Sequence, residues 1–184
     1  MDLLQQGKLP GSTVVATVMS NIGLHAFAKE HGLSLECTAV GDRNVLEKML
    51  EIGGRIGGEQ SGHTIFLEHA TTGDGQLTAL QFLQILKRSG KKASELVSIC
   101  PQYPQVLENV KLDNVPGLKE TIMGDQRLKE ACQREEEAMA GEGRVLVRAS
   151  GTEPLIRVMV EAKTTDIAQA CADRLVDLVN LLKK

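Results

Sequence analysis

Pro101 and Pro104 divide the sequence a little past its midpoint, in the segment Cys100-Pro101-Gln102-Tyr103-Pro104. Proline has a fixed φ and no backbone N–H, so neither a helix nor a central strand can run through this segment. The pattern of apolar residues starts again beyond it. We therefore predict two domains, covering residues 1–99 and 100–184.

The first part alternates strand and helix patterns. Residues 12–19 read STVVATVM, a β-branched apolar run typical of a strand that is buried on both faces of a parallel sheet. A helix over 21–31 with Ser20 as its N-cap, a strand over 33–40 and a helix from Gly41-Asp42 to Gly53-Gly54 follow. Further on, two short strands flank a glycine-rich turn within 55–67, and helices cover 75–90 and 91–99. This order predicts an α/β layer with right-handed crossovers.

The second part has a different order of elements. We expect strands over 105–112, 144–150 and 155–162, a charged helix over 126–140 and a terminal helix over 166–182. These elements predict a small α+β domain with an antiparallel sheet and two helices.

Composition excludes several classes of protein. The net charge of −3 and the pI near 5.8 argue against a nucleic-acid-binding protein. No apolar run approaches the roughly 18 residues of a membrane span, and Met1–Gln6 lacks the basic start and apolar region of a signal peptide. We therefore expect a cytoplasmic protein with neither nucleic acid nor membrane as a partner. Aromatic residues are only 2% of the chain, so a ligand is expected to be held by polar groups and backbone.

The cysteines and acidic residues predict no metal site. Cys37, Cys100, Cys132 and Cys171 are too far apart in the sequence for a close-spaced zinc or redox pair, and we expect reduced thiols that mostly fill the core. Asp74, in the sequence Gly73-Asp74-Gly75, is interpreted as a helix-start residue rather than a metal ligand.

The first candidate binding loop covers 148–157, RASGTEPLIR, between two alternating strands. Arg148 and Arg157 flank the turn, where two guanidinium groups can converge on a phosphate. Ser150 and Thr152 add hydroxyl groups, Gly151 can take a positive φ, and successive backbone N–H groups around it can form an anion-binding nest. A tight hairpin with surface arginines is an equally open interpretation.

The second candidate loop covers 58–63, GEQSGH. Glu59 can accept hydrogen bonds from two sugar hydroxyls, Ser61 can donate or accept one, and His63 can position or exchange a proton. The alternative is a glycine-rich turn with solvent-facing polar side chains.

Together, GEQSGH and RASGTEPLIR resemble motifs of the α-D-phosphohexomutases, and VATVMSN at 15–21, TAVGDR at 38–43 and TTGDG at 71–75 fit the same family. The sequence departs from the family at Asn44, where an aromatic residue is expected. The resemblance implies that 1–99 is the family's third domain, a mixed sheet with helices on both faces that lacks its first strand, and that 100–184 is its fourth domain.

The resemblance also implies roles for the residues of both loops. Glu59 and Ser61 would bind ring hydroxyls, with His63 beside the reacting phosphate. The phosphate that is not transferred would be held by residues of the fourth domain, namely Arg148, Ser150, Gly151, Thr152 and Arg157. Arg43 is a further candidate, as a source of positive potential.

The family's reacting groups are not found in this sequence. It contains neither the T-x-S-H-N-P-like loop of the phosphoserine nor the D-x-D-x-D-R-like loop that binds Mg²⁺. The resemblance therefore implies a C-terminal fragment of an intramolecular phosphotransferase, an isomerase that interconverts glucosamine 6-phosphate and glucosamine 1-phosphate. The Mg²⁺ site and phosphoserine would lie in a missing N-terminal half, which with the hexosamine phosphate is the expected partner.

Two consequences and two alternatives accompany this interpretation. The chain alone is expected to be inactive, and surfaces that normally pack on the missing half favour self-association. A mutase of mannose or glucose phosphates is one alternative. A non-catalytic sugar-phosphate binding module is the other, since such a module needs both loops but no serine or metal.

Overall fold

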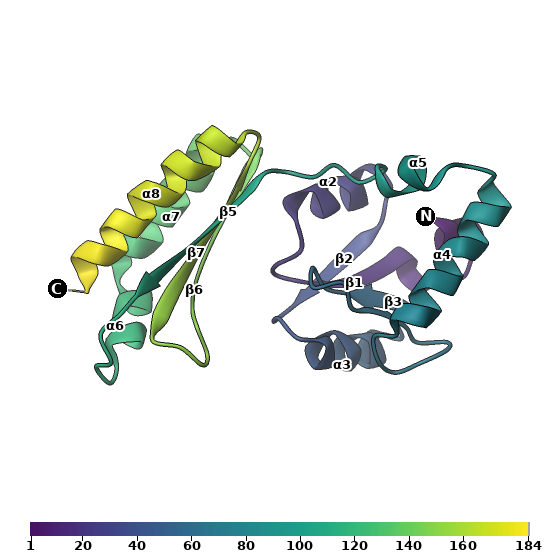
Figure 1. Cartoon of the computed structure of the whole chain (residues 1–184), viewed down its shortest axis with the longest axis horizontal. Helices are drawn as coiled ribbons and strands as arrows, with labels where there is room; N and C mark the ends of the chain where they lie inside the picture. Colours follow the sequence, from purple (N-terminus) through teal and green to yellow (C-terminus); the bar gives the residue numbers. More distant parts are fainter. Residues whose placement is uncertain (184) are drawn as a thin grey trace. The chain divides into compact units, whose positions relative to one another are not determined.

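The computed structural model describes residues 1–183, which form two compact units, one covering Met1–Gln102 and one from Tyr103 onward (Figure 1). The division between the units falls inside the double-proline segment. Each unit has its own sheet and its own apolar core.

The first unit contains a mixed four-stranded sheet with the order β2-β1-β3-β4. The strands are β1 (Thr13–Thr17), β2 (Ser34–Thr38), β3 (Ile56–Gly58) and β4 (Thr64–Phe66). Strand β1 pairs in parallel with β2 and β3, whereas β3 and β4 form an antiparallel hairpin. The prediction of a mixed sheet is confirmed.

Helices lie on both faces of this sheet, as Figure 1 shows for α2 and α3. The helical segments are α1 (Asp2–Gln5), a 3₁₀ turn (Pro10–Ser12), α2 (Ile22–Glu30), α3 (Asp42–Ile52), α4 (Gly75–Ser89) and α5 (Ala93–Val97). Helix α3 buries Val45 and Met49 against Val15 and Ile65 of the sheet. Gly57 permits this close packing, because a Cβ there would lie 2.7 Å from Val45 Cγ1.

The cap of helix α2 differs from the sequence-based expectation, whereas the cap of α4 agrees with it. Asn21, not Ser20, caps α2, since the Asn21 side chain accepts a hydrogen bond from the Gly23 N–H while Ser20 Oγ accepts one from the Thr17 N–H. Helix α4 forms as predicted with Asp74 as its cap, yet it has no buried residue, and its Leu80 and Leu83 are 65% and 57% exposed.

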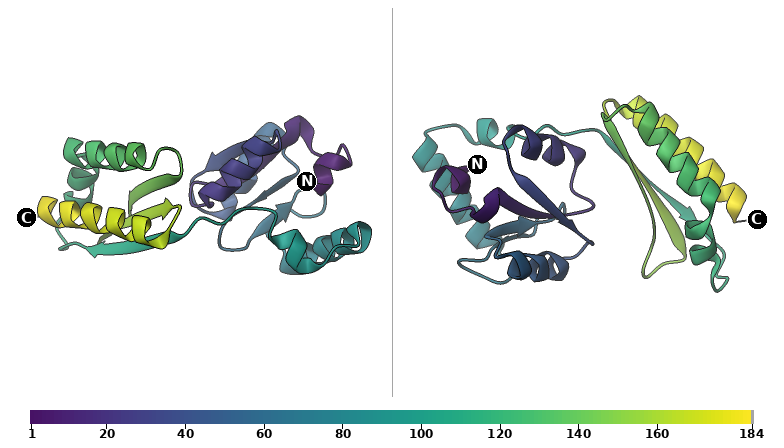
Figure 2. Two further views of the ribbon diagram at one scale, coloured as in Figure 1. Left: turned by 90° about the horizontal axis from the view of Figure 1, so that it is seen from above. Right: turned by 180° about the vertical axis from the view of Figure 1, so that it is seen from behind.

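The second unit is an antiparallel sheet with the order β5-β7-β6. Its strands are β5 (Gln105–Lys111), β6 (Gly143–Ala149) and β7 (Leu155–Ala162), and its two long helices are α7 (Gln126–Ala138) and α8 (Thr165–Leu182). Both helices pack on one face of the sheet (Figure 2). Alternate residues of β7, including Ile156, Val158 and Val160, point into this core.

A third helix of this unit, α6 (Leu118–Gly124), was absent from the sequence-based prediction of two helices. It is seven residues long, starts after Gly117 with φ of 80°, and buries only Ile122 completely. One buried residue gives too little apolar periodicity to indicate a helix.

The cysteines differ in their surroundings. Cys171 is buried in the core, but Cys37 is exposed, so the prediction of a core role is wrong for Cys37. Its position on β2 at the edge of the sheet explains the exposure. Within residues 1–183, no helix combines the length and the apolar character needed to cross a bilayer.

Candidate functional site

The loop from Glu59 to His63 is the turn of the β3–β4 hairpin. The Glu59 N–H donates to His63 O at 3.0 Å, which closes the turn. Gly58 is required at its start, because a Cβ there would lie 2.8 Å from His63 O, and Gly62 has φ of 98°. The glycines of the GEQSGH motif therefore shape a tight turn that brings the side chains of Glu59, Ser61 and His63 together.

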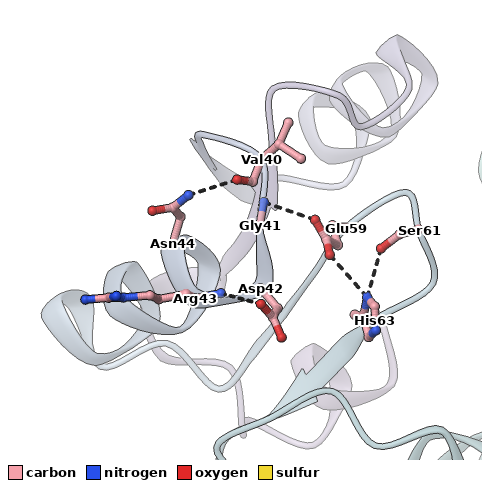
Figure 3. A network of polar contacts seen from close by, with 8 residues as sticks. All are labelled: Val40, Gly41, Asp42, Arg43, Asn44, Glu59, Ser61 and His63. Atoms are coloured by element: carbon pink, nitrogen blue, oxygen red, sulfur yellow. Dashed lines mark hydrogen bonds and ion pairs between the residues drawn. The ribbon is translucent and has the colours of Figure 1, made fainter. Parts of the chain in front are cut away.

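These side chains form one network around His63 Nδ1 (Figure 3). Glu59 Oε1 lies 3.2 Å from Nδ1 and Ser61 Oγ lies 3.0 Å from it. The Glu59 side chain is only 10% exposed, whereas that of His63 is 55% exposed. Within residues 1–183 the other ring nitrogen, Nε2, has no hydrogen-bond partner, so it is the nitrogen that a ligand can reach.

Glu59 is also held by the loop that precedes α3. Its Oε2 accepts a hydrogen bond from the Gly41 N–H at 3.2 Å. Gly41 has φ of 123°, and Asn44 Nδ2 fixes the same loop by donating to Val40 O at 2.9 Å. Gly41 is thus a site residue that sequence reasoning missed, although its motif, TAVGDR, was recognised.

Arg43 lies in the first turn of α3, directly after this loop, but it does not join the network. Its side chain is 87% exposed and donates to Glu47 Oε1 at 2.8 Å, and this hydrogen bond raises the pKa of Arg43. Figure 3 shows it extending away from Glu59 and His63.

Gly73, in the TTGDG motif, lies directly against the His63 side chain. A Cβ at Gly73 would stand 3.0 Å from His63 Cβ, so a larger residue would displace the ring. The next residue, Asp74, accepts from the N–H groups of Gln76 and Leu77 with Oδ1 and so begins α4 as predicted.

A cavity of about 430 Å³ opens beside Glu59. Its lining includes Ser20 and Asn21 after β1, Gly58 and Gln60 around Glu59, and Cys100. The cavity has a size ordinary for small-molecule sites, which measure about 300–1,000 Å³.

The second loop joins β6 and β7 in the other unit. Arg148 and Arg157 are direct partners across the antiparallel ladder, so their side chains leave the same face of the sheet. Burial and the charge of Arg157 lower the pKa of Arg148. Arg157 Nη2 contacts Glu153 Oε2 at 3.2 Å, while its Nε is buried without a hydrogen-bond partner. Like charges placed opposite each other destabilise a sheet, so this pair indicates a site for an anion.

The turn between these arginines is fixed at both ends and open in its centre. Ser150 is buried, its N–H donates to Leu155 O, and its Oγ accepts from the Glu153 N–H at 3.2 Å. Gly151 is outside the left-handed region, so the turn does not use the positive φ that a glycine permits. In the described part of the chain, the exposed amides of Gly151 and Thr152 have no partner and are free to bind a ligand.

The described residues contain no group of three or more His, Cys, Asp or Glu side chains that could hold a metal ion.

The fold and the two loops define an α-D-phosphohexomutase-type protein. The model of phosphoglucomutase/phosphomannomutase α/β/α domain III matches residues 1–103, and that of the family's C-terminal domain matches 107–178. The chain belongs to the phosphoglucomutase/phosphomannomutase family.

The chain is also similar to individual members. It is 54% identical over 178 residues to phosphoglucosamine mutase of Caldicellulosiruptor saccharolyticus and 52% identical over 179 residues to that of Acetivibrio thermocellus. In each case the match covers 97% of this chain but 39% of the relative, so the chain spans about two fifths of the length of these relatives.

Solved structures show the same fold at lower identity. Aspergillus fumigatus N-acetylphosphoglucosamine mutase in complex with GlcNAc-6P and magnesium matches with a TM-score of 0.74 at 19% identity, over 100% of this chain and 42% of that one. An N-acetylglucosamine-phosphate mutase in its substrate complex matches with a TM-score of 0.74 at 20% identity, over 91% and 38%.

Proposed function

We propose that this chain provides the sugar-binding and phosphate-binding parts of a phosphoglucosamine mutase, which interconverts glucosamine 6-phosphate and glucosamine 1-phosphate through a bisphosphate. The observation that carries the proposal is the direct pairing of Arg148 with Arg157 beside a turn with free amides. Two guanidinium groups and two N–H donors suit the three oxygens of a phosphate.

In the phosphate site, Arg148 and Arg157 would each donate to the phosphate that is not transferred. Gly151 and Thr152 would add their N–H groups, and Thr152 its hydroxyl. Ser150 would act through its Oγ, which holds the turn by accepting from the Glu153 N–H. Glu153 would release Arg157 when the phosphate binds, because the phosphate competes for the same guanidinium nitrogen.

In the sugar site, Glu59 and Ser61 would bind ring hydroxyls. The fixed position of Glu59, between the Gly41 N–H and His63, supports this role because a carboxylate that is already oriented loses little freedom on binding. His63 would present Nε2 to the reacting phosphate, and Arg43 would contribute positive potential.

We assign the phosphoserine and the Mg²⁺ of the proposed reaction to residues outside this chain. Phosphoryl transfer depends on a positioned acceptor and on stabilised charge at the metal. Since neither reacting motif occurs in the sequence, the chain alone is proposed to be inactive. Its partners would be the hexosamine phosphate and the remaining part of a mutase, in the cytoplasm.

A chimera tests the proposal. This chain would replace the corresponding part of the Caldicellulosiruptor saccharolyticus phosphoglucosamine mutase, and turnover of glucosamine 1-phosphate would be measured beside glucose 1-phosphate and mannose 1-phosphate. We expect turnover with preference for the amino sugar. A folded chimera without turnover would contradict the proposal, and preference for the other hexose phosphates would favour the alternative mutase.

Within that chimera, Arg148→Met should lower kcat/KM by roughly tenfold or more, since a charge-assisted hydrogen bond contributes about 1.5–3 kcal/mol. Arg127→Met is the matched control, because Arg127 is an exposed arginine of the same unit that pairs with Asp125. Equal losses in the two variants would contradict a phosphate site at Arg148.

Ligand binding by the isolated chain distinguishes the mutase fragment from a non-catalytic binding module. Tight binding of glucosamine 6-phosphate by the isolated chain would favour a non-catalytic binding module, because half of a site loses the advantage of convergent contacts. The exposed Leu80 and Leu83 of α4 support the expectation that the isolated chain self-associates. Sedimentation of the chain and of the Leu80→Gln, Leu83→Gln variant would test it.

A further inference from the structure

The side chain of Lys119, in helix α6, contacts the backbone of the β6–β7 turn. Its Nζ donates to the backbone oxygen of Ser150 at 2.8 Å and to that of Glu153 at 3.4 Å. The side chain therefore bridges the two ends of the turn that carries Gly151 and Thr152. Neither the motif nor the resemblance assigned any role to α6.

The first of these contacts sets the direction of an amide. Ser150 C=O and Gly151 N–H belong to one planar trans peptide unit, and they point in opposite directions. Because Nζ holds the carbonyl oxygen, the Gly151 N–H is directed away from Lys119. The second contact holds the Glu153 carbonyl oxygen and so fixes the turn. It directs no N–H group, because the next residue is Pro154, which has no backbone N–H.

Other contacts complete this arrangement. Leu112 N–H donates to Pro154 O at 2.8 Å, so three carbonyl oxygens of the loop are engaged by protein donors. Carbonyl oxygens repel an anion, whereas the free N–H groups of Gly151 and Thr152 attract one. The loop thus turns several acceptors into the protein and keeps its donors available.

We propose that Lys119 is a positioning residue that orients the Ser150–Gly151 peptide for anion binding and adds a positive charge to the site of Arg148 and Arg157. The inference rests on the proposed phosphate site. Helix α6 would thus support the reaction by positioning the phosphate-binding turn, although Lys119 itself touches no reacting atom.

The test uses the full chain labelled with ¹⁵N, titrated with inorganic phosphate. Lys119→Met keeps most of the side-chain length but removes the ammonium group, and Lys119→Arg keeps a donor. Lys129→Met is the control, since Lys129 is exposed on α7 and the change in net charge is the same. Thermal unfolding of each variant shows that it is folded.

Two readouts decide the proposal. In Lys119→Met we expect the heteronuclear NOE of Gly151 and Thr152 to fall, and the phosphate Kd to rise by roughly tenfold, as for a lost hydrogen bond to a charged group. Lys119→Arg should restore most of both, and Lys129→Met should change neither. An unchanged NOE in Lys119→Met, or an unchanged Kd, would overturn the inference.

The result for the wild-type chain separates the two proposals. Phosphate-dependent shifts at Gly151 and Thr152 support the phosphate site itself. Their absence in the wild type would overturn that site and with it the anion-binding role of Lys119, whereas the NOE comparison would still report whether Lys119 orders the turn.

Discussion

Asn44 stands where the resemblance led us to expect an aromatic residue after the GDR sequence, and the structure gives this single residue a defined contact. Its Nδ2 donates to Val40 O, and the next amide along the chain, that of Gly41, holds Glu59. A local side-chain hydrogen bond thus stabilises the loop that positions the proposed sugar-binding carboxylate.

Replacing Asn44 by alanine should loosen the loop. We expect the Gly41 amide to exchange its hydrogen about fivefold faster in Asn44→Ala, since the lost hydrogen bond contributes about 1 kcal/mol. Hydrogen exchange followed by NMR measures this rate. Asn114→Ala is the control, because Asn114 is an exposed asparagine of the other unit. Equal exchange at Gly41 in wild type and Asn44→Ala would show that the Val40 contact does not support the loop.

At the scale of elements, the packing of α3 on β3 depends on one residue without a side chain. A Cβ at Gly57 would stand 2.6 Å from Met49 Sδ and 2.7 Å from Val45 Cγ1, and both side chains are fully buried. Gly57→Ala should lower the free energy of unfolding by about 1–3 kcal/mol, as for other overpacked cores. Urea unfolding measures the change.

Gly75→Ala is the matched control for Gly57→Ala. Gly75 is the first residue of α4 and a Cβ there would meet nothing within 4 Å. Alanine favours helix over glycine by up to about 1 kcal/mol, so this variant should be as stable as the wild type or slightly more stable. Similar losses in both variants would contradict the packing argument.

An ion pair between two helices of the second unit makes a pH-dependent contribution to the free energy of unfolding. Arg174 of α8 donates to both carboxylate oxygens of Glu135 on α7, at 2.7 and 2.6 Å, and these hydrogen bonds lower the pKa of Glu135. Because the folded pKa lies below the unfolded value of about 4.5, the stabilisation is complete above that value and is lost as the pH falls through the folded pKa. Arg174 is 59% exposed, so the contribution is about 1 kcal/mol or less.

The variant Arg174→Met should therefore be less stable than the wild type at pH 7 and nearly equal to it at pH 2. Chemical denaturation at both values measures the difference. Lys129→Met, which removes a positive charge from α7 without breaking a side-chain contact with Glu135, should not reproduce this pH dependence. A loss of equal size at both pH values would contradict the ionic origin of the effect.

The elements themselves were largely predictable from the sequence, because β1 is a continuous run of β-branched apolar residues and β7 alternates apolar residues along one face. Ser20 and Asn21 are both good capping residues, so type alone could not decide which one caps α2. The contacts that shape the sites were not predictable. Glu59 meets Gly41 across 18 residues, and Lys119 meets Ser150 across 31, and such contacts depend on how separate elements pack.

At the scale of the whole molecule, the two units differ in the size of their cores. The second unit buries fifteen residues in one cluster, whereas the cluster between α3 and the sheet of the first unit contains four. Burial of apolar surface is the main favourable contribution to folding. We therefore expect the unit from Tyr103 onward to be the more stable one, with two unfolding transitions rather than one.

Thermal unfolding followed by methyl NMR signals can separate these transitions, with Val15 and Val45 reporting on the first unit and Val158 and Val179 on the second. Gly57→Ala should lower the midpoint of the first set alone. Arg144→Met should lower that of the second set, since it leaves the fully buried carboxylate of Glu161 without the guanidinium 2.9 Å away, and breaking a buried ion pair costs about 3–5 kcal/mol. If both sets of signals moved together in both variants, the chain would be a single cooperative unit and the separation of its two cores would have no thermodynamic consequence.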